Sequence, residues 1–293
     1  MSGRRNDAEP PRDEAPRIDA LLPAEVARKA EEVGARKARL DLVTLLALAV
    51  LAGAFIALGA MFSTTILSGA ATAPWGMARF VAGLGFSVGL ILVVVGGAEL
   101  FTGNTLMVMA LASRKIGWPE MLRAWTIVYL GNLVGAVGTA GLAVLAGQYL
   151  YDGGGVGKVA LGIARAKAEL PFLQALFLGV LCNVLVCLAV WLSLAARSVA
   201  DKVLAILLPI AAFVAAGFEH SVANMYFIPL GQMILAWAPD SFWSMTGLAP
   251  ADYGPVGFGG LVANLVPVTI GNVIGGGVLV GLVYWFVYLR RRT

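Results

Sequence analysis

Charged residues are scarce in this chain, and histidine and cysteine are almost absent. Only 13% of its 293 residues are charged, whereas 59% are hydrophobic, and the mean hydropathy is +0.85. Because a soluble domain carries about a quarter charged residues, this composition excludes a soluble protein and indicates an integral membrane protein whose partner is the lipid bilayer. The net charge of +4 does not predict nucleic-acid binding, because the basic residues flank apolar segments, as in membrane proteins.

The chain has a single histidine, His220, and two cysteines, Cys182 and Cys187. The cysteines are five residues apart in one apolar segment, so they would lie on different faces of a helix and are expected to be small packing residues. An intramembrane enzyme would need a nucleophile with its base, or several metal ligands. H-E-x-x-H does not occur in the sequence, and its one G-x-S-x-G match, from Gly85 to Gly89, lies inside an apolar run and not at the turn from a strand to a helix that a serine nucleophile needs. We therefore predict a protein that is not an enzyme, with no catalytic residue, metal or cofactor.

The N-terminal part divides into two segments. Residues 1–20 are rich in Pro, Arg, Asp and Glu and lack the apolar core of a signal peptide, so they are expected to form a disordered tail. Residues 21–40 carry apolar residues at helical spacing with Lys and Arg between them, which predicts an amphipathic helix on the cytoplasmic membrane surface. A membrane anchor is the preferred interpretation of this helix, and a gate over a pore is the alternative.

Six apolar regions in residues 41–293 are long enough to cross a bilayer, which takes about 20 residues of helix. They are 42–62, 79–110, 121–147, 171–195, 203–236 and 259–289. The second and the fifth are too long for simple spans, and a polar cluster interrupts each of them. Seventeen of the 21 lysines and arginines fall on one side of this arrangement, which places both termini in the cytoplasm.

The two halves of the chain repeat each other. GNLVGA in the third region corresponds to GNVIGG in the sixth, and the second and fifth regions share the spacing E-x-x-x-x-N, at Glu99 to Asn104 and at Glu219 to Asn224. Since three spans is an odd number, the second half must enter the membrane from the opposite side. Inverted repeats place a substrate path at their interface, where discontinuous helices meet.

The interruptions GGAELFTGN and GFEHSVAN predict helix breaks. Glycine allows the backbone to leave the helix, and freed backbone groups are tolerated in a membrane only where protein or a cavity surrounds them. A half-helix N-terminus presents positive potential, which suits an anion. We interpret Glu99 and Glu219 as structural groups that accept hydrogen bonds from backbone N–H groups of each break, rather than as the site itself.

Five segments of the sequence together resemble a known family. The segments GFEHSVANMYFIP, GGAELFTGN, GNLVGA, CNVLVCLAVWL and NLVPVTIGNVIGGG occur in the order typical of the formate/nitrite transporter family, and the likeness runs from about Leu21 to Arg290. It is strongest to the formate channel branch. The resemblance implies an all-α membrane protein of the bacterial inner membrane, with an aquaporin-like arrangement of six helices, a pore in each protomer and assembly as a homopentamer.

The resemblance also implies roles for single residues. His220 matches a central pore histidine, and Thr102 matches its partner on the loop that interrupts the second span. The further pathway residues that it implies are Leu90, Leu100 and Phe101 at an inner constriction, Phe86 and Phe213 at an outer constriction, Asn183 in the pore and Lys167 near the outer vestibule. For the leucines and phenylalanines, ordinary packing is the alternative, and Lys167 could be a solvated loop lysine.

We expect His220 to be neutral in a narrow apolar pore, because burial disfavours the charged imidazolium. It could donate a hydrogen bond to a formate ion or give it a proton. Gly103 and Asn104 replace the Ser-Thr pair common in formate channels, so nitrite and hydrosulfide stay alternative substrates. A proton-coupled symporter also stays open, whereas a water or glycerol channel is disfavoured because the chain has no Asn-Pro-Ala turn.

Overall fold

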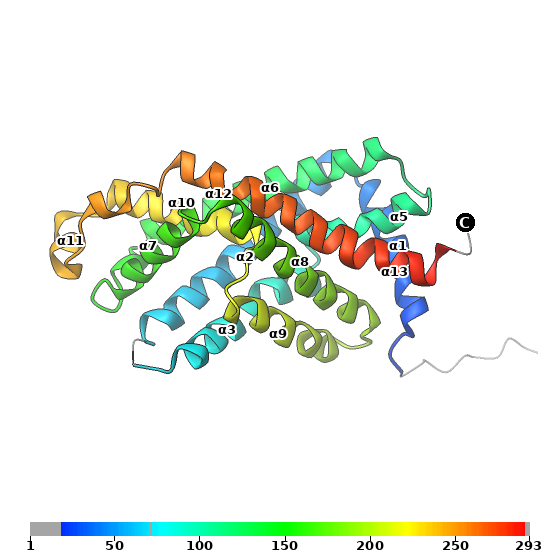
Figure 1. Ribbon diagram of the computed structural model, residues 1–293, viewed down its shortest axis with the longest axis horizontal. Helices are drawn as coiled ribbons and strands as arrows, with labels where there is room; N and C mark the ends of the chain where they lie inside the picture. Colours follow the sequence, from blue (N-terminus) through cyan, green and yellow to red (C-terminus); the bar gives the residue numbers. More distant parts are fainter. Residues whose placement is uncertain (1–18, 71, 291–293) are drawn as a thin grey trace, which may run out of the picture.

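The regular structure of this protein consists of helices (Figure 1). The computed structural model describes residues 19–70 and 72–290, and no strand occurs in these ranges. The tail predicted at residues 1–20 lies almost entirely outside them. In chain order the elements are α1 (Pro23–Ala38), α2 (Leu42–Ser68), α3 (Trp75–Gly96), α4 (Phe101–Asn104), η1 (Thr105–Met107), α5 (Val108–Ala112), α6 (Trp118–Leu145), η2 (Gln148–Leu150), α7 (Gly155–Ala168), α8 (Phe172–Ala195), α9 (Val199–Ala215), α10 (Ser221–Trp237), α11 (Asp240–Thr246), η3 (Pro250–Tyr253), α12 (Phe258–Asn272), the π-helical η4 (Val273–Leu282) and α13 (Val283–Tyr288).

The six predicted spans correspond to six helical segments. Helices α2, α3, α6 and α8, together with the run Pro250–Tyr288, are each long and apolar enough to cross a membrane, which makes five such helices among the described residues. The remaining span is divided into α9 and α10, each 17 residues long. The second span continues beyond α3 through the short helices α4 and α5. The prediction that the second and fifth spans are broken is therefore confirmed.

Besides the short α11, the sequence does not predict helix α7. It contains glycine and three basic residues, so it lacks the long apolar run by which the spans are recognised. It precedes α8 in the way that α1 precedes α2. Each inverted half therefore consists of a short amphipathic helix followed by three spans, the second of which is broken.

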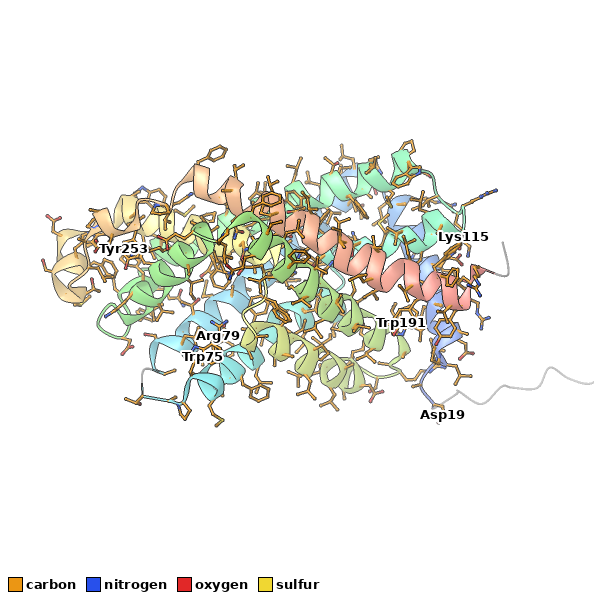
Figure 2. All side chains as sticks on the ribbon, in the orientation of Figure 1. Asp19, Trp75, Arg79, Lys115, Trp191 and Tyr253 are labelled. Atoms are coloured by element: carbon orange, nitrogen blue, oxygen red, sulfur yellow. The ribbon has the colours of Figure 1, made fainter. Side chains whose placement is uncertain are left out.

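The short helices lie at opposite ends of the molecule. In Figure 1, α1 and α5 lie beside the end of α13, whereas α7 and α11 lie at the far end; Lys115 and Trp191 also mark the α1 end in Figure 2. Val26 and Ala27 on the apolar face of α1 are 1% and 0% exposed, and Lys29 Nζ donates to the carbonyl of Leu194 at 2.8 Å. The apolar face of α1 thus packs on protein, which differs from the expected position on the lipid surface.

Glycines bring the third span of each half against the first. A Cβ added at Gly135 would overlap the carbonyl oxygen of Val50 on α2, and a Cβ at Gly275 would overlap that of Val180 on α8. Both glycines belong to the repeated GN motifs of α6 and of α12 with η4. Small residues allow helix backbones in membranes to approach closely, and this geometry agrees with the interpretation that these glycines serve packing.

Candidate functional site

The helix breaks lie at two glycines with left-handed backbone. Gly97 follows α3 with φ of +83°, and Gly217 follows α9 with φ of +75°. Residues with a Cβ rarely adopt this conformation, so glycine commonly ends helices in this way. After each break the chain runs extended to the next half-helix, which begins at Phe101 in the first repeat and at Ser221 in the second.

Two asparagines hold the interrupted backbone. The side-chain oxygen of Asn132 on α6 accepts from the N–H of Phe101 at 2.9 Å, and that of Asn272 on α12 accepts from the N–H of Ser221 at 2.9 Å. Each amide group also donates to a carbonyl of the break and to a carbonyl of the neighbouring span, at 2.7–3.0 Å. Our sequence interpretation uses these GN motifs as a repeat signal but gives the asparagines no role. A buried amide at the same mid-span position in both halves is the signal that identifies them.

The two glutamates bind side chains instead of backbone N–H groups. Glu99 and Glu219 are 6% and 4% exposed. Asn104 Nδ2 donates to Glu99 at 2.8 Å, and Asn224 Nδ2 donates to Glu219 at 2.6 Å. The sequence analysis predicts instead that each carboxylate accepts from the backbone of its break. The asparagines of α6 and α12 bind that backbone, so the carboxylates are available for other donors.

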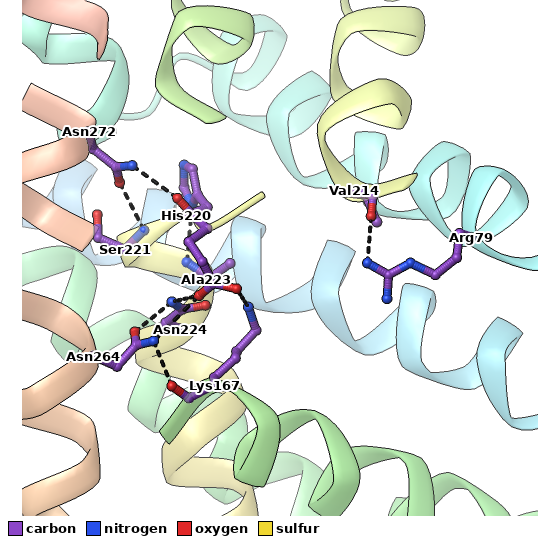
Figure 3. Close-up of polar contacts among 10 residues, drawn as sticks. Arg79, Lys167, Val214, His220, Ser221, Ala223, Asn224, Asn264 and Asn272 are labelled. Carbon is purple, nitrogen blue, oxygen red and sulfur yellow. Dashed lines mark hydrogen bonds and ion pairs between the residues drawn. The ribbon is translucent and has the colours of Figure 1, made fainter. Parts of the chain in front are cut away.

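A lysine completes each carboxylate cluster. Lys37, in the last turn of α1, lies 3.1 Å from Glu99, and Lys167, in the last turn of α7, lies 2.8 Å from Glu219 (Figure 3). The two pairs occupy equivalent places in the inverted repeat. Lys167 is thus an ion-pair partner and not a free loop lysine, and Lys37 is a residue that the sequence interpretation counts only for membrane orientation.

His220 contacts Thr102 across the interface of the two halves. Its Nε2 lies 2.9 Å from Thr102 Oγ1, and the backbone N–H of Ala223 donates to its Nδ1 at 3.0 Å. His220 is therefore the N-cap residue of α10, and the bond at Nδ1 places the proton of the neutral ring on Nε2. The side chains of His220 and Thr102 are buried. The equivalent position in the first half is the buried Leu100, as the repeat predicts.

Asn183 supports this pair from behind. It is 0% exposed, and its Nδ2 donates to the carbonyl of Thr102 at 3.2 Å and to the carbonyl of Asn272 at 2.6 Å. Thr105 Oγ1 binds the same Thr102 carbonyl at 2.7 Å. Asn183 thus holds the loop that carries Thr102.

Two cavities lie on either side of the His220–Thr102 pair. We name them by the short helix beside them. The α7-side cavity has a volume of about 280 Å³, and the α1-side cavity has a volume of about 210 Å³. Lining the α7-side cavity are Arg79, Phe86, Lys167, Phe213, Glu219 and His220. Lining the α1-side cavity are Lys37, Leu90, Glu99, Leu100 and Gly103.

Aromatic rings close the α7-side cavity toward His220. The rings of Phe86 and Phe213 meet edge to face with centroids 5.4 Å apart, and Phe213 stacks on the imidazole of His220 at 6.0 Å. Phe101, which the resemblance assigns to the inner constriction, packs instead on Tyr129 of α6, with centroids 4.9 Å apart. It lines neither cavity.

Two inverted halves whose broken helices meet at a buried polar pair between two cavities define a membrane transport protein. The chain belongs to the formate/nitrite transporter family, whose model matches residues 24–286. It is 47% identical to the formate channel FocA of Escherichia coli K12 over 275 residues, or 94% of this chain and 96% of the relative. It is 40% identical to FocA of Haemophilus influenzae over 264 residues, or 90% and 93% of the two chains.

Solved structures show the same fold. The structure of a pentameric formate channel with formate bound matches with a TM-score of 0.81 at 46% identity, and the match covers 85% of this chain and 98% of that one. An ion channel of the same family matches with a TM-score of 0.76 at 31% identity, covering 90% and 98%. The predicted family, the all-helical fold and the multi-pass membrane character are therefore confirmed.

Proposed function

We propose that this protein conducts formate through a path in each protomer of a homopentamer. The names of the relatives support the substrate and the assembly. The observation in this chain that carries the proposal is the His220–Thr102 pair, which places an N–H donor and a hydroxyl at the apolar boundary between two cavities.

The path runs from one cavity to the other past two apolar barriers. Phe86 and Phe213 border it on the α7 side, and Leu90 and Leu100 border it on the α1 side. These barriers exclude hydrated ions, because stripping water from a carboxylate costs several kcal/mol or more unless new hydrogen bonds replace it. Between the barriers, His220 supplies the replacement donor. Asn183 positions Thr102 and lines neither cavity.

His220 acts in this scheme as a neutral hydrogen-bond donor. A second ring proton would have to go to Nδ1, where the backbone N–H of Ala223 already donates. Adding it would break the cap of α10 and leave that N–H unpaired, at a cost of about 1–3 kcal/mol. Since a neutral imidazole does not yield its proton to a carboxylate, we infer that the anion accepts a hydrogen bond from Nε2–H, and that any proton it takes comes from elsewhere.

Nitrite and hydrosulfide are the alternative substrates, and proton-coupled transport is the alternative mode. Both can be tested on the purified protein in liposomes. Competition among formate, nitrite, hydrosulfide, acetate and lactate should show formate preferred, whereas stronger competition by nitrite or hydrosulfide would contradict the formate assignment. Under an imposed pH gradient a channel carries formate only to equilibrium, so accumulation above equilibrium would establish coupling.

We further propose that the protein lies in the bacterial inner membrane with the α1 end in the cytoplasm. Among the described residues, basic side chains concentrate at that end, in the α1 segment at 21–40 and in the loops that follow α5 and α8, and the channel domain begins at residue 41. An impermeant thiol reagent added to intact cells should label Lys158→Cys on α7 and spare Arg114→Cys. The opposite pattern would reverse the orientation.

A further inference from the structure

The charge of the α7-side cavity rests on one arginine. Among the described residues that line this cavity, Arg79 and Lys167 are cationic and Glu219 is anionic. Lys167 and Glu219 form an ion pair at 2.8 Å, so their charges compensate each other. The positive charge that remains uncompensated is the guanidinium of Arg79.

Arg79 uses little of its hydrogen-bonding capacity. It projects from the second turn of α3 (Figure 2), and one terminal nitrogen donates to the carbonyl of Val214 in the last turn of α9 at 2.9 Å (Figure 3). Its guanidinium carbon lies 5.7 Å from the ring centroid of Trp75. A guanidinium has five N–H donors, and the buried Nε has no hydrogen-bond partner among the described residues.

These observations distinguish Arg79 from the lysine that the sequence highlights. A lysine paired with a carboxylate attracts an incoming anion only weakly, because the two charges compensate each other. A half-buried arginine with unused donors supplies a net positive charge and N–H groups of fixed orientation. The guanidinium is also planar, and its forked N–H groups match the two oxygens of a carboxylate. Formate and nitrite present two oxygens in that arrangement, and hydrosulfide presents only one acceptor atom.

We propose that Arg79 recruits the anion into the α7-side cavity and selects two-oxygen anions over hydrosulfide before they reach His220. This inference rests on the proposed anion conduction and adds to it a residue that acts on entry and not on passage. Its loss should therefore raise the half-saturating anion concentration while the maximal rate stays close to that of the wild type.

The test compares Arg79→Gln and Arg79→Lys with the wild type in proteoliposomes, with initial uptake of formate and of hydrosulfide measured over a concentration series. Lys158→Gln is the matched control, because it removes an exposed positive charge from α7 without altering the cavity lining. For Arg79→Gln we expect the half-saturating formate concentration to rise about tenfold, as for loss of one charged hydrogen bond. For hydrosulfide we expect a rise of only about threefold, as for loss of a partly screened charge. Arg79→Lys should retain uptake of hydrosulfide more fully than that of formate.

Equal half-saturating concentrations in Arg79→Gln and Lys158→Gln would overturn the inference. A fall in maximal rate alone, with unchanged half-saturation and selectivity, would also overturn it, because that result would assign Arg79 only to holding the end of α9. If Arg79→Gln does not assemble, the comparison of formate and hydrosulfide uptake in Arg79→Lys tests the inference. The lysine ammonium can still donate to the Val214 carbonyl, but it lacks the planar fork of the guanidinium. A wild type that carries neither anion would refute the proposed function itself, which separates the two failures.

Discussion

Asn272 is predicted to hold the loop that carries His220. Replacing it with alanine removes three buried hydrogen bonds, of 2.9 Å from the N–H of Ser221, 2.8 Å to the carbonyl of Gly179 and 3.0 Å to the carbonyl of Glu219. The Gly179 carbonyl lies within a helix and retains that bonding. The N–H of Ser221 and the carbonyl of Glu219 belong to the break. In the variant each of these two buried groups loses its hydrogen-bond partner.

An unpaired buried group costs about 1–3 kcal/mol, although single hydrogen bonds in membrane proteins average nearer 0.6 kcal/mol. For the two groups together we expect about 2 kcal/mol of lost stability. Asn272→Asp should destabilise the protein at least as much as alanine, because it keeps the acceptor for Ser221 but places a buried carboxylate oxygen against the carbonyls of Gly179 and Glu219. Thr139→Val is the control, since Thr139 Oγ1 binds only a carbonyl of its own helix.

The measurement is equilibrium unfolding of the purified protein in mixed detergent micelles, accompanied by formate flux in liposomes. Flux should fall together with stability in Asn272→Ala, because His220 follows the displaced loop. If Asn272→Ala unfolds at the same detergent ratio as Thr139→Val and conducts normally, the proposed support of the break by this amide is wrong.

Three further predictions follow from the site. His220→Asn keeps an N-cap side chain but loses the ring N–H donor, so formate flux should fall about tenfold in an intact pentamer. Unchanged flux with unchanged pH dependence would exclude the proposed role of His220 as hydrogen-bond donor to the anion. Gly275→Ala should destabilise the protein by about 1–3 kcal/mol through overlap with α8, measured in the same micelle titration, and full stability would contradict the close helix approach. Deleting residues 1–40 removes Lys37 and leaves the Glu99 carboxylate without its cationic partner in the α1-side cavity, so formate flux should fall. Adding Glu99→Gln to the deletion should restore the flux. Normal pH-dependent flux in the deletion alone would exclude any gating by α1.

Much of the fold could be predicted from the sequence because the membrane limits the choices. Apolar runs of about 20 residues or more cross the bilayer as helices, and glycine beside buried polar residues marks where those helices break. The shared spacing around Glu99 and Glu219 reveals the repeat, and it correctly aligns His220 with Leu100. Helix α7 is not predicted because it is short and contains glycine and basic residues, which are also typical of loops.

The tertiary structure alone decides which side chains meet the path. In a soluble protein the polar face of a helix points to water, so periodicity shows which face is wet. In a membrane bundle nearly every face of a helix is apolar, because one face contacts lipid and another contacts protein. The face that lines the transport path therefore leaves little periodic signal in the sequence. The sequence therefore determines the spans, the breaks and the pairing of the halves. Only the folded arrangement shows that Phe101 turns toward Tyr129, that Glu219 compensates the charge of Lys167, and that Arg79 keeps unused donors at the cavity.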